Sequence, residues 1–216
     1  MRPPLAWNDP APGPTRIKIC GLTEESHVHA AIEAGAHAIG LVLADRSPRQ
    51  ITPDTAMRLS QVAAGHIATV TLLVNPTDVC QVASQWVQLH GAESVELAES
   101  FHRTTPTIKA VAWTDAQRLL DWDRCEAVDR LLVDGAHGGG GEPFDHAALT
   151  PVRPQIRTPL VVAGGLTPDT VGKVIELLSP WGVDVSSGVE SSRGVKDEEL
   201  IHAFCKAVRD QDAASG

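Results

Sequence analysis

Short apolar runs rich in β-branched residues alternate with amphipathic stretches along nearly the whole chain, and this alternation constrains the fold more than any other feature. The apolar runs cover residues 16–20, 38–43, 67–74, 86–90, 108–113, 129–134, 159–163 and 183–186. The amphipathic stretches cover residues 24–34, 53–63, 76–85, 93–101, 114–120, 144–149, 167–178 and 197–209. Apolar strands separated by helices are typical of parallel sheets with both faces covered. The pattern predicts an α/β fold.

Eight strand and helix units are enough to close a barrel, and 216 residues are at the lower end of the length that a (β/α)8 barrel needs. We therefore expect a single TIM barrel over residues 15–216. An open doubly wound sheet is the structural alternative. Residues 1–14 contain many prolines and are expected to form a short, extended Pro-rich N-terminal tail. A recognition peptide for a partner is the other interpretation of this tail.

Composition and charge exclude several classes of protein. The chain is 43% hydrophobic, which supplies enough apolar side chains for a core. Its formal net charge of −9 argues against nucleic acid or an anionic membrane as a partner. The four cysteines have no C-x-x-C spacing and are read as reduced thiols in a cytoplasmic protein.

A metal site is not expected from the sequence. His27 and His29 are two residues apart in a predicted helix and so face different ways. No other grouping of histidine, cysteine and acid has the spacing of metal ligands. The remaining histidines are interpreted as surface residues, except His90, which ends a predicted strand and is a candidate substrate contact.

Polar residues gather where the predicted strands end. Cys20, His90, Asp134, the pair Gly164-Gly165 and the triplet 186–188 all stand at such ends or just beyond them. In a barrel these ends form one rim, which is where enzymes of this fold carry their active sites. The spacing therefore predicts one site containing a thiol, a carboxylate and two loops of small residues.

Cys20 is the candidate base of that site. It ends a predicted strand, Gly21 permits a sharp turn, and Thr23 is expected to cap the following helix. The partial positive charge of a helix N-terminus favours a thiolate over a thiol. The alternative is that Cys20 is only a small buried hydrophobic residue.

Asp134 is the candidate acid. It follows three apolar residues of the sixth predicted strand, and apolar surroundings raise the pKa of a carboxyl group so that it can donate a proton. A solvated or arginine-paired carboxylate is the alternative. The glycine-rich segment 138–143 is predicted to be either a lid over a ligand or a simple connection.

Two loops are candidates for binding phosphate. Gly164 and Gly165 precede a helix that is expected to begin at Thr167 and Pro168, and Ser186 and Ser187 follow the last strand. Backbone N–H groups at such positions bind phosphate in many barrels. A tight turn is the alternative reading of the two glycines.

Two charged residues complete the candidates. Arg49 lies on the loop after the second strand and can hold a carboxylate with its planar guanidinium group, although loop arginines are often only solvated. Asp184 lies within the eighth strand, where a carboxylate needs a partner or a ligand. It is a candidate for orienting Cys20, for binding substrate or for accepting backbone hydrogen bonds.

The order and content of several motifs resemble the phosphoribosylanthranilate isomerase family. The most specific are KICGLT at residues 18–23 and DVSSGVE at residues 184–190. Further matching blocks lie at residues 35–40, 47–49, 74–75, 87–91, 108–111, 131–134, 144–145, 164–166 and 183–190. They follow one another in order over roughly residues 15 to 206.

The resemblance implies a cofactor-free isomerase of tryptophan biosynthesis. Its reaction would be the Amadori rearrangement of N-(5-phosphoribosyl)anthranilate to 1-(2-carboxyphenylamino)-1-deoxyribulose 5-phosphate. By position in the family motifs, Asp134 would be the general acid and Cys20 the general base. Arg49 would bind the anthranilate carboxylate, and Gly164, Gly165, Ser186 and Ser187 would bind the phosphate. We expect a cytoplasmic protein that is a monomer or a homodimer.

The chain departs from the family pattern in a few places. The segment between Asn75 and Trp86 is shorter than the family's third helix, which predicts a trimmed barrel face there. Gln50 stands where an aromatic residue is common, and the lid carries Glu142-Pro143. Two other functions stay open from the sequence. One is another sugar-phosphate isomerase or synthase, and the other is a non-catalytic phosphometabolite-binding protein.

Overall fold

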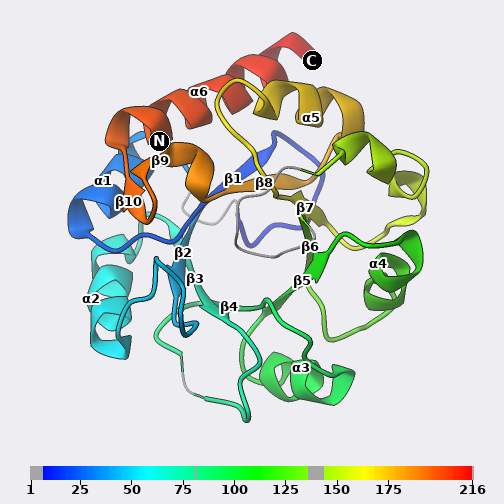
Figure 1. The fold of residues 1–216 in the computed structure, drawn as a ribbon, viewed down its shortest axis with the longest axis horizontal. Coiled ribbons are helices and arrows are strands. Elements are labelled where there is room, and N and C mark those ends of the chain that lie inside the picture. The colour runs from blue at the N-terminus through cyan, green and yellow to red at the C-terminus, as the bar shows by residue number, and fades with distance from the viewer. Residues whose placement is uncertain (1–6, 81, 136–143, 216) are drawn as a thin grey trace.

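Eight parallel strands close into a barrel, and helices lie around it (Figure 1). The computed structural model describes residues 7–80, 82–135 and 144–215. The strands are β1 (Arg16–Cys20), β2 (Ala38–Val42), β3 (Ala68–Leu73), β4 (Trp86–Leu89), β5 (Thr107–Ala112), β6 (Arg130–Asp134), β7 (Leu160–Val162) and β8 (Gly182–Val185). Each strand pairs with the next along the chain, and β8 pairs with β1. The predicted barrel is confirmed, and the open sheet is wrong.

Helices and one small hairpin surround the strands. The α-helices are α1 (Glu25–Glu33), α2 (Pro53–Ala63), α3 (Val95–His102), α4 (Ala116–Asp123), α5 (Val171–Leu178) and α6 (Glu198–Ser215). Three short 3-10 helices are η1 (His146–Leu149), η2 (Arg153–Gln155) and η3 (Ser187–Val189). The strands β9 (Glu190–Ser192) and β10 (Val195–Lys196) form an antiparallel hairpin that the sequence analysis missed. None of the helices in the described ranges is both long and apolar enough to cross a membrane.

Successive residues of a strand face two different cores, because side chains alternate between the two faces of a sheet. Ile17 and Ile19 of β1 pack in a large apolar cluster that includes helix residues such as Phe204. Cys20 belongs instead to a small cluster with Val42 of β2, Ala44 of the loop after β2, and Leu72 of β3. This alternation carries every second residue of β1 into the barrel.

The connection from β3 to β4 contains no helix among residues 74–80 and 82–85, so the amphipathic stretch predicted at residues 76–85 is not helical. Hydrogen bonds to the outer face of β3 hold this loop. The Thr71 hydroxyl donates to Ser84 Oγ at 2.8 Å, and Gln85 N–H donates to Thr69 Oγ1 at 3.1 Å. Thr69 and Thr71 thus replace the apolar surface against which a helix would pack. The barrel therefore has no helix on this face among the described residues, in line with the predicted trimmed face.

Two other predicted helices differ in extent. The stretch at residues 144–149 forms the single 3-10 turn η1, in which Asp145 Oδ1 accepts a hydrogen bond from Ala147 N–H. Helix α5 begins at Val171 rather than Thr167, because Thr167 N–H donates to Thr170 Oγ1 and forms a turn before the helix. Both differences arise from local side-chain bonds to the backbone, which compete with a helical start.

The tail is not separate from the barrel over its described residues. Trp7 is completely buried, and its ring meets the Trp181 ring edge-on at a centroid distance of 4.9 Å. The Trp86 indole donates to Asn8 Oδ1 at 2.9 Å, and the Arg130 guanidinium stacks over the Trp86 and Trp181 rings. We call Trp7, Trp86, Arg130 and Trp181 the basal cluster. The expectation of an extended tail is therefore wrong for residue 7 onward.

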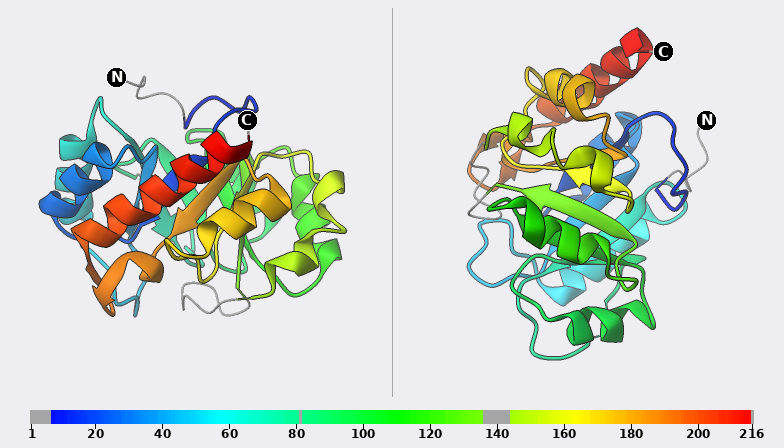
Figure 2. Two further views of the ribbon diagram at one scale, coloured as in Figure 1. Left: turned by 90° about the horizontal axis from the view of Figure 1, so that it is seen from above. Right: turned by 90° about the vertical axis from the view of Figure 1, so that its right-hand side faces the viewer.

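The tail and the β9–β10 hairpin lie at opposite ends of the barrel (Figure 2). A hollow of about 520 Å³ lies beside the tail and is bordered by Pro10, Pro12 and Trp181. Its polar side chains serve the fold, since Asp212 accepts hydrogen bonds from Thr15 and Arg153 donates to Leu178 O. The groups with candidate chemistry lie at the other end.

Candidate active site

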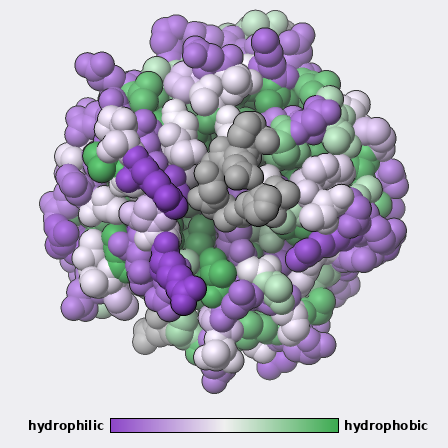
Figure 3. Space-filling model, viewed as in Figure 1, coloured by the Kyte–Doolittle hydropathy of each residue, from purple (hydrophilic) through white to green (hydrophobic). Residues whose placement is uncertain are grey.

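All of the predicted site residues border two adjoining hollows at the carboxyl ends of the strands. The larger cavity, of about 410 Å³, is bordered by Cys20, Arg49, His90, Asp134, Asp184 and Ser186. The smaller hollow adds Gly164, Gly165 and Ser187, and it shares Asp134, Asp184 and Ser186 with the larger. This face of the molecule is hollowed near its centre, with strongly hydrophilic side chains around the hollow (Figure 3). The structure therefore brings these residues together at one end of the barrel.

Cys20 is 4% exposed and ends β1 inside the barrel mouth. Its carbonyl oxygen accepts a hydrogen bond from Ser186 Oγ at 3.0 Å, which ties the end of β1 to the loop after β8. Two residues earlier on the same face of the strand, the buried Lys18 ammonium is paired with Asp184 Oδ1 at 2.9 Å. A thiol, an ammonium group and a carboxylate thus occupy neighbouring positions within the mouth.

Opposing effects act on the Cys20 thiol. Burial raises its pKa above the ordinary value, the charge of Lys18 opposes this rise most strongly, and Asp184 adds to it. The expected cap at Thr23 is wrong, because the N-cap residue of α1 is Glu24 and makes no side-chain capping bond. Lys18, rather than a capped helix start, is thus the main group that favours the thiolate.

Asp134 lies across the cavity at the end of β6, where it is 7% exposed. Its Oδ1 accepts a hydrogen bond from Gly135 N–H at 2.8 Å, and its Oδ2 lies 3.2 Å from Nε2 of His90. The other ring nitrogen of His90 is 2.8 Å from Nε2 of Gln88. The structure therefore joins the candidate acid to the predicted substrate contact His90.

A buried ion pair fixes the loop that carries His90. The Lys109 ammonium, on the outer side of β5, donates to Glu93 Oε2 at 2.5 Å and to Gly91 O at 2.8 Å. Glu93 also accepts hydrogen bonds from the backbone N–H groups of Asn75 and Gly91. Lys109 and its partner Glu93 hold the turns after β3 and β4 together next to the cavity.

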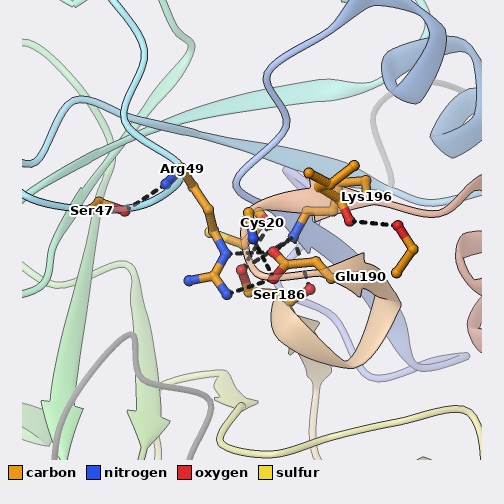
Figure 4. A network of polar contacts seen from close by, with 9 residues as sticks. Cys20, Ser47, Arg49, Ser186, Glu190 and Lys196 are labelled. Atoms are coloured by element: carbon orange, nitrogen blue, oxygen red, sulfur yellow. Dashed lines mark hydrogen bonds and ion pairs between the residues drawn. The ribbon is translucent and has the colours of Figure 1, made fainter.

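Arg49 and Lys196 converge on one carboxylate, that of Glu190 (Figure 4). Arg49 donates through Nε at 2.5 Å and through Nη2 at 2.9 Å, and Lys196 donates to Oε1 at 2.7 Å. Lys196 also donates to Ser186 O at 2.8 Å. Burial alone would raise the pKa of Glu190, but the bonds from Arg49 and Lys196 lower it to about 2. The guanidinium group of Arg49, which was predicted to bind a carboxylate, thus binds the carboxylate of Glu190 through Nε and Nη2.

The two loops predicted to bind phosphate touch one another. Gly164 and Gly165 have φ angles of 83° and 69°, which residues with a side chain rarely adopt. A Cβ atom on Gly188 would lie only 1.8 Å from Leu166 O, so glycine is required for the close approach of the β8 loop to the β7 loop. Backbone groups of both loops therefore border one small hollow.

Several residues of the site were not predicted from the sequence. Lys18 could have been found, because it stands two residues before Cys20 on the same strand face. Glu190 and Lys196 belong to the unpredicted hairpin, and only the DVSSGVE motif signalled the first of them. The interpretation of the remaining histidines as surface residues is wrong for His37, which is buried. His37 Nδ1 accepts a hydrogen bond from Ile17 N–H and so has a structural role.

Two predictions need separate mention. The lid predicted at residues 138–143 lies outside the described residues. Within residues 7–80, 82–135 and 144–215, no three histidine, cysteine or acidic side chains gather in a way that could hold a metal ion.

Comparison with known proteins gives consistent matches. The family model for N-(5′-phosphoribosyl)anthranilate (PRA) isomerase matches residues 17–207. The N-(5′-phosphoribosyl)anthranilate isomerase of Leptothrix cholodnii is 40% identical over 215 residues, covering 95% of this chain and 96% of that protein. A solved phosphoribosylanthranilate isomerase in complex with reduced 1-(o-carboxyphenylamino)-1-deoxyribulose 5-phosphate is 33% identical, with a TM-score of 0.80. The alignment covers 91% of this chain and 99% of that one.

A second solved structure bears on assembly. It shows monomers of the dimeric phosphoribosylanthranilate isomerase of Thermotoga maritima and is 32% identical, with a TM-score of 0.80. It covers 91% of this chain and 99% of its own. Both the family model and the curated relative span nearly the whole barrel described above.

Proposed function

The chain belongs to the N-(5′-phosphoribosyl)anthranilate isomerase family of tryptophan biosynthesis, and we propose that Cys20 and Asp134 carry out the proton transfers of its aldose–ketose rearrangement. The observation that carries this proposal is the shared cavity: a thiol and a carboxylate border it together, next to two small-residue loops. The substrate is a small molecule, N-(5′-phosphoribosyl)anthranilate, and the product is 1-(2-carboxyphenylamino)-1-deoxyribulose 5-phosphate.

Asp134 acts first, as the general acid. Its protonated carboxyl group donates a proton to the ribose ring oxygen, the C1–O bond breaks, and the anilino nitrogen stabilises the ring-opened iminium ion. The hydrogen bond from Gly135 N–H to Oδ1 holds the carboxyl group in place, and His90 Nε2 lies 3.2 Å from Oδ2. A positioned acid of this kind contributes about 10² to 10⁴ in rate.

Cys20 acts second, as the general base. Its thiolate removes the proton from C2 of the iminium ion, which leaves a neutral enolamine. The C2 hydroxyl then loses its proton and C1 gains one, giving the ketone. Asp134 has lost one proton and Cys20 has gained one, so proton exchange with solvent restores both groups for the next turnover.

The remaining residues hold the two ends of the substrate. Arg49 borders the larger cavity, next to the apolar wall formed by Val42 and Leu72, which suits an aromatic ring with a carboxylate. The phosphate is placed on Gly164, Gly165, Ser186 and Ser187, which border the smaller hollow. The ribose then lies between these ends, beside Cys20, His90, Asp134 and Asp184.

Conversion of freshly made phosphoribosylanthranilate to the ketose tests the assignment. Cys20→Ala and Asp134→Ala should each lower kcat by at least roughly a hundredfold, with circular dichroism unchanged. Cys125→Ala, at a half-buried cysteine outside the cavity, should retain the wild-type rate. Full activity in both active-site variants would sink the assignment. Arg49→Ala should raise KM, and an unchanged KM for this substrate would favour a different sugar phosphate.

The assembly and location of the protein are also part of the proposal. We propose a monomer or a homodimer, since the dimeric relative from Thermotoga maritima has also been solved as monomers. A cytoplasmic location suits an enzyme of amino-acid biosynthesis with free cysteines. Light scattering at several protein concentrations measures the first point directly.

A further inference from the structure

Lys18 is completely buried and stands two residues before Cys20 on the strand face that points into the barrel. Lysine is almost never fully buried unless its charge is paired, because removing an ammonium group from water is costly. Its partner is Asp184 on the neighbouring strand β8, at 2.9 Å. An apolar residue would fill this interior position at lower cost, so the charge needs a reason beyond packing.

Gly40 shows how close the ammonium group lies to the sulfur atom. It is the β2 residue paired with Cys20 across the sheet. A Cβ atom on Gly40 would lie 2.6 Å from Cys20 Sγ and 3.1 Å from Lys18 Nζ. Both atoms therefore border the same space, and that space exists because Gly40 has no side chain.

Other charged groups also face the thiol. From β8, the Asp184 carboxylate disfavours a thiolate, and from β10 the Lys196 ammonium favours one. Arg49 and Asp134 lie further round the same cavity, and Glu190 neutralises part of the charge of Arg49 and Lys196. Lys18 is the cation with the greatest effect on Cys20, and interaction with Asp184 and Cys20 raises its own pKa despite burial. It therefore stays charged at neutral pH.

We propose that Lys18 is a positioning residue for catalysis, whose ammonium group beside the sulfur atom of Cys20 favours the thiolate against the effect of burial inside the barrel. The ion pair with Asp184 orients the Lys18 side chain, and the negative charge of Asp184 weakens the effect of the ammonium group on the thiol. The proposal rests on the function proposed for Cys20 as base, but the charge state of the thiol can be measured without turnover. When the sulfur takes the C2 proton, the ammonium group keeps Asp184 as its anionic partner.

The rate of alkylation of Cys20 by iodoacetamide, measured across pH, reports the thiolate directly. Peptide mass mapping is needed because Cys80 is exposed and Cys125 is half-buried. Lys18→Met should slow the alkylation of Cys20 at pH 7 at least roughly tenfold and move its midpoint to higher pH, which corresponds to one pKa unit or more. Lys18→Arg should restore much of the rate.

Two further variants separate this role from a structural one. Asp184→Asn removes the competing carboxylate and should speed alkylation, the opposite direction from Lys18→Met. Lys206→Met removes an exposed lysine on α6 and should change neither alkylation nor turnover. If the Lys18–Asp184 pair were only structural, Lys18→Met and Asp184→Asn would instead change the rate of Cys20 alkylation in the same direction. That result, or an unchanged pH profile in Lys18→Met, would overturn the proposal.

The pH dependence of kcat/KM distinguishes failure of this inference from failure of the proposed function. In Lys18→Met, the rise of kcat/KM with pH that reports deprotonation of the base should move to higher pH. The midpoint of Cys20 alkylation should move with it. If alkylation shifts but the rise of kcat/KM does not, Lys18 favours the thiolate and Cys20 is not the base. If Lys18→Met does not fold, Lys18→Arg and Asp184→Asn still decide the matter, since equal alkylation midpoints in both variants and the wild type contradict the proposal.

Discussion

Glu190 is the carboxylate that Arg49 and Lys196 share, and its charge is therefore essential to the geometry of Arg49. Its side chain is 4% exposed and accepts hydrogen bonds from Arg49, Lys196 and Gly194 N–H. Glutamine at this position has the same shape but one fewer acceptor and no charge. The substitution tests how far a single ionised group orders the Arg49 side chain.

Glu190→Gln should destabilise the protein at pH 7 by about 1–3 kcal/mol, because buried donors lose their anionic acceptor. The difference from wild type should depend on pH. The pKa of Glu190 falls from the ordinary 4.5 to about 2 on folding, so its contribution is fully present above about pH 4.5 and is lost as pH falls toward 2. Urea unfolding at pH 7, 5 and 3 measures this, and a difference that grows toward acid pH would contradict it.

At the residue scale, position along a strand predicted which side chains lie together, but it did not predict their hydrogen-bond and ion-pair partners. Cys20, His90 and Asp134 each end a strand, so counting residues in the alternating pattern placed them at one rim. The partners of Arg49 and Asp184 come from other parts of the chain: Glu190 lies 141 residues from Arg49, and Lys18 lies 166 residues from Asp184. No local pattern reports such contacts.

At the scale of elements, the strands were predicted more accurately than the segments between them. The barrel strands follow from near-continuous apolar runs, and β1 has the predicted bounds. The α-helices predicted for the β3–β4 connection and for residues 144–149 were wrong. The periodicity of both segments suits a helix, but hydrogen bonds of Thr69, Thr71 and Asp145 hold other conformations. Hydrophobic periodicity predicts which residues can be buried on one face of a segment, but it does not predict what that face packs against.

The connection after β4 offers a test at this scale. Lys109→Met should cost about 3–5 kcal/mol of stability, because it leaves the buried Glu93 carboxylate without its cation. For a chain of this size that corresponds to a fall in Tm of roughly 2–4 °C for each kcal/mol. Thermal unfolding followed by circular dichroism measures it. Lys206→Met is the matched control at an exposed pair, where a loss of more than about 1 kcal/mol is not expected.

At the scale of the whole molecule, the two ends of the barrel have different tasks. The carboxyl ends of the strands carry Cys20, Asp134 and the two small-residue loops, while the basal cluster closes the other end with aromatic rings and the Arg130 guanidinium. Segments distant in the chain meet there, since Trp7 precedes β1 and Trp181 directly precedes β8. The sequence did not predict this, because a lone tryptophan among prolines has no pattern.

Trp7→Ala should therefore destabilise the protein by about 3–5 kcal/mol, the usual cost of truncating a buried tryptophan, without a comparable effect on KM. Met57→Ala, at a residue that is 52% exposed, should change stability by less than about 0.5 kcal/mol. Urea unfolding and steady-state kinetics on both variants provide the measurements. Wild-type stability in Trp7→Ala would mean that the basal cluster is not needed to close the barrel.

The basal cluster also sets an order of events during synthesis. Trp7 leaves the ribosome before its partners Trp86, Arg130 and Trp181, and β1 gains its second neighbouring strand only after β8 has been made. At about 5–20 residues per second, Trp7 lacks the Trp181 ring for roughly 10 to 35 seconds. During that interval its indole is an exposed apolar group on a nascent chain. Trp7 is thus made before its partners and reaches its final place only after the last of them.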